Sequence, residues 1–144
     1  MDPITTDELL KVLSQLDTTT ELKNYTENHT SSEGTQTLSE YLESLLESKG
    51  LKKSDIIRDA DLQRNYGYQV FSGLRTPGRN KLLALCLSMQ LTVKEAQYVL
   101  KLAGEGTLYS KNRRDAILIF ALQKNLSVMA TNDLLYEMQE EILA

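Results

Sequence analysis

The chain has 144 residues, a formal net charge of −4, a Leu-rich composition, and only two Pro and seven Gly. This length supports one compact domain with an appendage, and the composition favours an all-α fold over a sandwich or a barrel. One Cys and one His exclude an internal disulfide, a Cys-rich zinc site and metal ligation by a His pair. Because we find no signal-peptide pattern and no run of roughly 18 apolar residues, we expect a cytoplasmic protein that makes no membrane contact.

Charge is unevenly distributed along the chain. Between Lys49 and Lys81, eight Lys or Arg stand against three Asp, which gives this stretch a net charge of +5. Residues 1–47 instead hold ten carboxylates and only two Lys. Because neutralisation of phosphates supplies most non-specific affinity for nucleic acids, the basic block is the part of the chain that we expect to attract a polyanion.

Residues 1–36 are expected to form an acidic N-terminal arm with a linker. Thr5 and Glu8 have the spacing of a capping box, and the Leu residues that follow recur at helical spacing, which predicts a short helix over about 6–16. A second short helix is expected over about 19–28, and the polar segment HTSSEGTQT that follows has nothing to bury. We expect this arm to dock on a partner or shield a surface instead of joining the core.

Three helices are predicted between residues 37 and 73. Thr37 and Glu40 form another capping box, and an apolar stripe that ends at Lys49-Gly50 predicts a helix over 38–49. Two short helices are then expected within 52–61 and 62–72, with a tight connector around Asp61 and a stop at Gly73. Two short helices joined this tightly after a longer one form a helix-turn-helix, whose second helix is placed to enter a major groove.

The next predicted helix begins at Arg79 or Asn80 and is apolar nearly all round, so we expect it to be buried. Its Cys86 is expected to be a small buried hydrophobic residue, with redox sensing as the alternative. Thr92 and Glu95 open a further helix that runs to about residue 103, with Gly104 as its cap.

Two more helices are predicted in the last 40 residues. Ser110 can cap a helix over about 111–124, and Ser127 or Val128 begins a last helix that runs close to the end of the chain. A shift of 35 residues aligns these two helices with the preceding pair, which indicates either a duplicated hairpin or a chance likeness between hairpins. Lys111, Arg113 and Arg114 form a second basic cluster, which could contact phosphate or pair with the acidic arm.

The segment from Leu38 to Leu102 resembles the helix-turn-helix domain of the Cro/C1 type, or XRE family. The resemblance rests on short motifs in the first three helices and on spaced apolar residues after them: Leu42 with Leu45-Leu46, Lys49-Gly50-Leu51, Ser54-Asp55-Ile56-Ile57, Phe71-Ser72-Gly73 with Arg75-Thr76-Pro77, and then Leu83, Leu87, Leu91 and Ala96. It implies a lambda repressor-like five-helix DNA-binding domain over 37–104, extended over 105–144 by a C-terminal helical hairpin on the same core. The sequence departs from the family pattern at Asp61, where many members have Gly, and at Gly67, where a β-branched residue is usual.

The candidate site residues lie on and around the expected recognition helix. Arg can read guanine as a fork, Asn and Gln can read adenine, and Tyr can contact a thymine methyl group or a phosphate. The candidates for base reading are Gln63, Arg64, Asn65, Tyr68 and Gln69. The candidates for phosphate contact are Lys52, Lys53, Ser54, Arg75, Arg79 and Lys81.

These features predict a sequence-specific DNA-binding transcriptional regulator of bacterial or phage-like type, which needs no cofactor and no metal. Double-stranded DNA is the expected partner, and a homodimer and a protein partner bound through the acidic arm are further candidates. The alternative is a non-enzymatic protein-interaction adaptor on a helix-turn-helix scaffold, which grips an acidic partner with Tyr66, Tyr68 and the basic face. We expect no catalysis, because the chain has no nucleophile with a base partner, no metal set and no phosphate loop.

Overall fold

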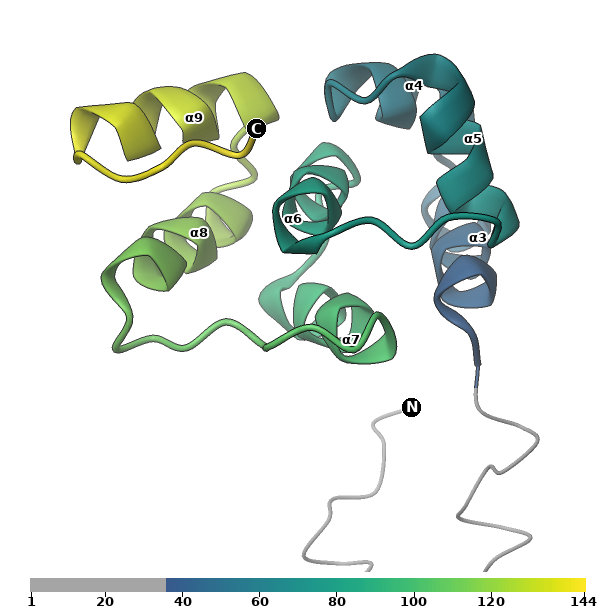
Figure 1. Ribbon diagram of the computed structural model, residues 1–144, viewed down its shortest axis with the longest axis horizontal. Helices are drawn as coiled ribbons and strands as arrows, with labels where there is room; N and C mark the ends of the chain where they lie inside the picture. The colour runs from purple at the N-terminus through teal and green to yellow at the C-terminus, as the bar shows by residue number, and fades with distance from the viewer. Residues whose placement is uncertain (1–35) are drawn as a thin grey trace, which may run out of the picture. The chain divides into compact units, whose positions relative to one another are not determined.

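The computed structural model describes residues 36–144, and every regular element in this range is an α-helix (Figure 1). The helices are α3 (Leu38–Lys49), α4 (Lys53–Asp59), α5 (Arg64–Ser72), α6 (Arg79–Ser88), α7 (Val93–Leu102), α8 (Arg113–Gln123) and α9 (Val128–Glu137). The all-α prediction is confirmed for this range. The two helices and the linker predicted before residue 36 lie outside the described residues. Among the described helices, none has the length and apolar character needed to cross a membrane.

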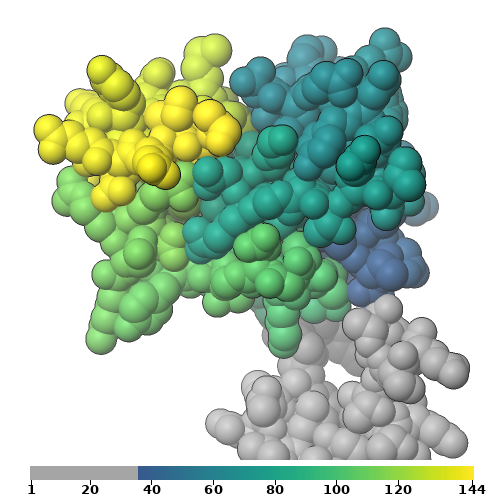
Figure 2. Space-filling model, in the orientation of Figure 1, coloured from purple at the N-terminus to yellow at the C-terminus, as the bar shows by residue number. Residues whose placement is uncertain are grey.

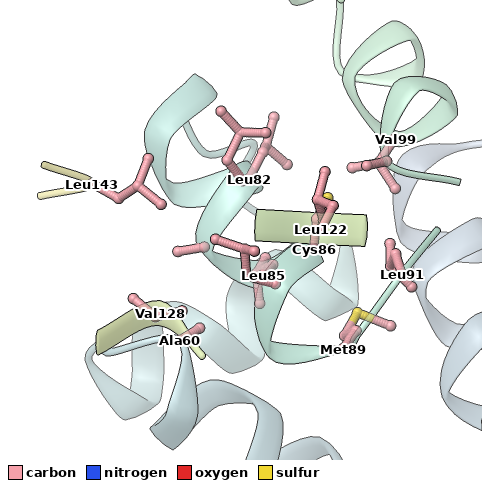
Figure 3. Packing of buried hydrophobic residues seen from close by; sticks show 14 of the residues in the cluster. Ala60, Leu82, Leu85, Cys86, Met89, Leu91, Val99, Leu122, Val128 and Leu143 are labelled. Atoms are coloured by element: carbon pink, nitrogen blue, oxygen red, sulfur yellow. The ribbon is translucent and has the colours of Figure 1, made fainter. Parts of the chain in front are cut away.

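Helix α6 lies at the centre of this bundle and contacts α4, α7, α8 and α9. Residues Leu82 to Leu87 are all buried, as expected for a helix that is apolar nearly all round. The side chains around α6 come from elements far apart in the sequence, including Ala60, Val99, Leu122, Val128 and Leu143 (Figure 3). A single apolar cluster therefore joins α3 at one end of the described chain to the residues that follow α9.

Helix ends follow the predicted capping residues. Thr37 with Glu40 and Thr92 with Glu95 both form complete capping boxes, in which each side chain bonds the backbone of the other residue. Gly50 ends α3 at a φ of 64°, and Gly73 ends α5 at a φ of 87°, a region that other residues rarely adopt. Local sequence signals therefore fix both limits of α3, the end of α5 and the beginning of α7, whereas α5 begins at Arg64, two residues after the predicted Leu62, because Gln63 caps it.

The same turn joins the helices of three successive hairpins, α4–α5, α6–α7 and α8–α9. At its centre Asp61, Gln90 and Asn125 have positive φ values of 60°, 54° and 54°. Each is followed by a Leu whose N–H donates to a carbonyl five residues earlier, in Leu62 to Ile57, Leu91 to Cys86 and Leu126 to Ala121. Helices α7 and α9 begin 35 residues apart, as the alignment of the two hairpins predicts. The turn with a positive φ followed by Leu also joins α4 to α5, a hairpin that this alignment did not include.

The last two helices differ from the prediction at one end each. Helix α8 begins at Arg113, because Asn112 and not Ser110 caps it by accepting a hydrogen bond from the N–H of Asp115 at 3.0 Å. Helix α9 ends at Glu137, and the chain turns back at Gln139, where φ is 63°. This return is held by tertiary contacts, since the buried Leu143 donates its N–H to Oδ1 of Asn132 at 2.7 Å.

Candidate nucleic-acid interface

The predicted recognition helix is α5, and its position depends on close packing against α4. Gly67 is buried in the middle of α5, and a Cβ added there would lie 2.4 Å from Cγ2 and 2.8 Å from Cγ1 of Ile57. Ile57 is itself 2% exposed, so its branched side chain would have to shift within the core to make room. The glycine that departs from the family pattern thus permits the two helices to approach closely.

The inner side of α5 anchors the helix to the core. Val70 and Phe71 are each 1% exposed, and Tyr66 packs against the same cluster as a half-buried residue. Ser39 of α3 donates its hydroxyl hydrogen to the carbonyl of Phe71, which joins the two helices near the end of α5. These contacts fix which side of α5 faces outward.

The five candidates for base reading lie on α5 or at its N-cap. Arg64 and Asn65 are exposed in the first turn, Tyr68 is 37% exposed, and Gln69 is half-buried. Gln63 caps the helix, since its Oε1 accepts a hydrogen bond from the N–H of Tyr66 at 2.8 Å. The side-chain oxygen of Gln63 is therefore occupied by the helix, whereas its amide nitrogen has no partner among the described residues.

Several cations of the basic block are already paired with carboxylates. The pairs are Lys49 with Glu95, Lys53 with Glu43, Arg58 with both Asp55 and Asp59, and Arg79 with Asp115. Glu95 also completes the cap of α7, and its burial opposes ionisation. The hydrogen bonds from Thr92 and the charge of Lys49 outweigh this burial and hold the pKa of Glu95 below its ordinary value.

Arg79 differs from the other phosphate candidates because two nitrogens of its guanidinium, Nε and Nη2, make hydrogen bonds within the fold. Nη2 donates to Oδ1 and Oδ2 of Asp115 at 3.2 and 3.1 Å, and Nε donates to the carbonyl of Gly106 at 3.0 Å. Asp115 is 7% exposed and also accepts from the N–H of Tyr109 at 3.0 Å. Sequence analysis did not identify Asp115, because its partners are separated from it along the chain and only the fold brings them together.

Four cations of the block make no ion pair with any residue in the described range. Lys52 and Arg75 are exposed at the start of α4 and after the end of α5. Arg64 lies over the ring of Tyr68 at 5.9 Å, and Lys81 lies over the ring of Tyr66 at 4.5 Å. We call these four cations, together with Asn65, Tyr68 and Gln69, the α5 face. Its positive charge remains after the other cations are neutralised by their partners.

Ser54 adjoins this face from the first turn of α4. It lines a shallow pocket of about 440 Å³ together with Arg64 and Tyr68. The pocket is mostly apolar because Ile57 and Leu62 also contribute to it. In the view of Figure 2, the teal segment that contains α4 and α5 forms one side of the surface, and α8 and α9 form the other.

The second basic cluster holds the chain end in place. Arg113 pairs with Glu140 at 3.3 Å and donates to the carbonyl of Met138, and Arg114 donates to the carbonyl of Glu141 at 2.9 Å. The two arginines thus bind the segment that follows α9. This role differs from both sequence-based predictions, which were contact with phosphate and pairing with the acidic arm. Lys111 remains exposed.

The alternative role of Cys86, redox sensing, depends on a reactive thiolate. Cys86 is buried as predicted, and its burial raises the thiol pKa to about 12, which disfavours the reactive thiolate. Over residues 36–144, no group of three or more His, Cys, Asp or Glu is placed to hold a metal ion.

Comparisons with protein-family models, with curated proteins and with solved structures found no match.

Proposed function

We propose that this protein is a sequence-specific DNA-binding transcriptional regulator that inserts α5 into the major groove. In this proposal α3 to α7 act as a lambda repressor-like domain, and the C-terminal hairpin α8–α9 extends its core. The observation that carries the proposal is the α5 face, which combines an exposed polar helix with four cations that lack a carboxylate partner among the described residues. Such a combination provides both phosphate attraction and groups that discriminate between base edges.

The polar side chains of the α5 face have different chemical roles in the proposal. Arg64 is the candidate for the O6 and N7 atoms of guanine, and Asn65 and Gln69 are the candidates for adenine. The two aromatic contacts hold Arg64 and Lys81 at the helix surface without neutralising them, so both remain available to DNA. Gln63 would contribute only its amide nitrogen, because its oxygen caps α5.

The phosphate contacts are assigned to the cations that are free in the described structure. Lys52 lies at the start of α4, Arg75 follows the end of α5, and Lys81 lies over the ring of Tyr66 in α5, so we assign these three cations to the DNA backbone. Lys53 and Arg79 are neutralised by Glu43 and Asp115, and they would have to leave these partners to bind a phosphate directly. Ser54 is the candidate for a hydroxyl contact at the start of α4.

A homodimer is the assembly that fits this mode of binding, because twofold symmetry pairs two half-sites roughly 34 Å apart. The exposed side of α8 and α9 offers a surface for it. Phe120 is 46% exposed, and Tyr136 is 80% exposed. Both are large apolar groups of the kind that contribute most to protein interfaces.

The direct test is selection of bound molecules from a random-sequence DNA pool with the full chain at near-physiological salt. We expect enrichment of one motif, arranged as two inverted half-sites about one helical turn apart. Binding that is weak, independent of sequence and lost as salt rises would reject sequence-specific recognition.

The second candidate function is a protein-interaction adaptor that uses the same basic surface. The net charge of −4 and the departures from the family pattern at Asp61 and Gly67 favour it, and the turn of α4–α5 recurs in α6–α7 and α8–α9, where no DNA contact is expected. The turn by itself is therefore a packing unit of this chain and does not distinguish a DNA reader from a scaffold. In the adaptor, Tyr66 and Tyr68 with their cations would bind an acidic protein segment, and the DNA selection would enrich no motif.

A further inference from the structure

The three repeated turns converge on one groove, whose lining contains none of the residues of the α5 face. Asp61, Gln90 and Asn125, the residues at the centres of the turns, all line this groove of about 620 Å³, which we call the turn groove. Three segments from different parts of the chain thus form a single concave surface. Ligand sites are usually concave and largely preformed, and this surface has both properties.

The floor of the turn groove is apolar and its edge carries an adaptable apolar side chain. Leu87 is 3% exposed and Val128 is 5% exposed, so both belong to the core while lining the groove. Met129, at the start of α9, is 76% exposed. Unbranched methionine side chains fit many apolar partners, which makes Met129 suited to cover a bound side chain.

The rim of the turn groove is acidic. Its only basic residue is Arg58, which is already paired with Asp55 at 3.3 Å and with Asp59 at 3.2 Å. Asp61 and Asp133 also line the groove, and neither has an ion-pair partner in the described range. This charge repels nucleic acid and acidic ligands and attracts cations.

We propose that the turn groove binds a segment of a protein partner that presents a Lys or Arg next to an apolar side chain of the size of Leu. The cation would lie between Asp61 and Asp133, and the apolar side chain would pack on Leu87 and Val128 under Met129. The inference does not rest on DNA binding, because it uses a different surface with the opposite charge. It adds a protein-binding function to the α5 face.

The test begins with selection of random 12-residue peptides displayed on phage against the full chain. Enriched peptides are then synthesised, and their dissociation constants are measured by fluorescence anisotropy. We expect them to carry a Lys or Arg within a few positions of Leu, Ile or Met. The double variant Asp61→Asn/Asp133→Asn should weaken binding about tenfold, since each exposed pair contributes up to about 1 kcal/mol.

Two further variants separate groove binding from loss of fold. Asn tolerates the positive φ of position 61, and the thermal midpoint of each variant is compared with that of the wild type. Met129→Lys changes a side chain that is 76% exposed, so it should fold normally and still weaken peptide binding. Glu137→Gln, on the same helix but outside the groove, is the matched control and should bind as the wild type does.

Peptides that lack cations, or that bind the double variant and Met129→Lys as tightly as the wild type, would overturn the proposal. The proposal would also be overturned if selection on the wild type enriched no peptide relative to selection on the double variant. A concentration-dependent dimer of the wild type that Met129→Lys abolishes would also overturn it and assign the groove to a second copy of the chain. None of these results depends on whether the protein binds DNA.

Discussion

The contact between Gly67 and Ile57 provides a quantitative test of how α5 is positioned. In an open helix, Gly→Ala is stabilising by about 1 kcal/mol, because alanine has the higher helix propensity. At position 67 the new Cβ would meet Cγ2 of Ile57 at 2.4 Å and Cγ1 at 2.8 Å, inside a core where Ile57 is 2% exposed. Overpacking of this kind costs about 1–3 kcal/mol, so after the gain of about 1 kcal/mol we expect Gly67→Ala to lower the free energy of unfolding by up to about 2 kcal/mol net.

A double-mutant cycle isolates this contact from other effects of the substitution. Ile57→Ala removes both γ carbons and should cost about 2–5 kcal/mol because it leaves a cavity. In that background Gly67→Ala should become neutral or stabilising, which gives a coupling energy of about 1–3 kcal/mol. Urea unfolding followed by circular dichroism at 222 nm provides all four values.

The control for this cycle is Gly106→Ala, because a Cβ at position 106 meets no atom within 4 Å. It should change the unfolding midpoint little in either background. If Gly67→Ala stabilises the wild type, or if its effect is the same with Ile57 and with Ala at position 57, close packing is not the reason for this glycine.

Three further predictions concern the turn, the cap of α7 and the buried ion pair. Gln90→Gly should raise the free energy of unfolding in urea by about 1 kcal/mol, because a φ of 54° costs a residue other than glycine about this much. A loss of stability would show that the backbone of this turn is not strained. Because folding lowers the pKa of Glu95, its ionised carboxylate stabilises the folded state. This stabilisation is fully present above the pKa of the unfolded state, about 4.3, and is lost as pH falls through the lower pKa of the folded state. The unfolding free energy of the wild type should therefore fall faster below about pH 5 than that of Glu95→Gln, and parallel curves would oppose this. Asp115→Asn should lower the free energy of unfolding in urea by about 3 kcal/mol, because it leaves the guanidinium of Arg79 without its carboxylate. A loss below 1 kcal/mol would show that this pair does not anchor the segment between α7 and α8.

Local signals in the sequence were sufficient for most helix limits. The capping boxes at Thr37 and Thr92 and the positive-φ glycines Gly50 and Gly73 act within a few residues, so their outcome could be predicted from spacing alone. Burial of α6 followed from its composition in the same way.

Features that depend on distant residues could not be predicted. The segment after α9 contains helix-forming residues, yet it turns back because Arg113, Arg114 and Asn132 bind its backbone. The reason for Gly67 lies on the neighbouring helix, in the side chain of Ile57. The candidate base-reading residues could be placed on one helix from periodicity, but the ion pairs that occupy Lys53 and Arg79 required the fold.

The most direct test of the proposed function compares two variants on the DNA motif obtained by selection and on a scrambled duplex. Arg64→Ala should weaken binding to the motif by about 1–3 kcal/mol and leave binding to the scrambled duplex nearly unchanged. Lys52→Ala should weaken both duplexes equally and reduce the slope of log affinity against log salt by about 1. Equal losses on both duplexes with Arg64→Ala would contradict base reading by α5.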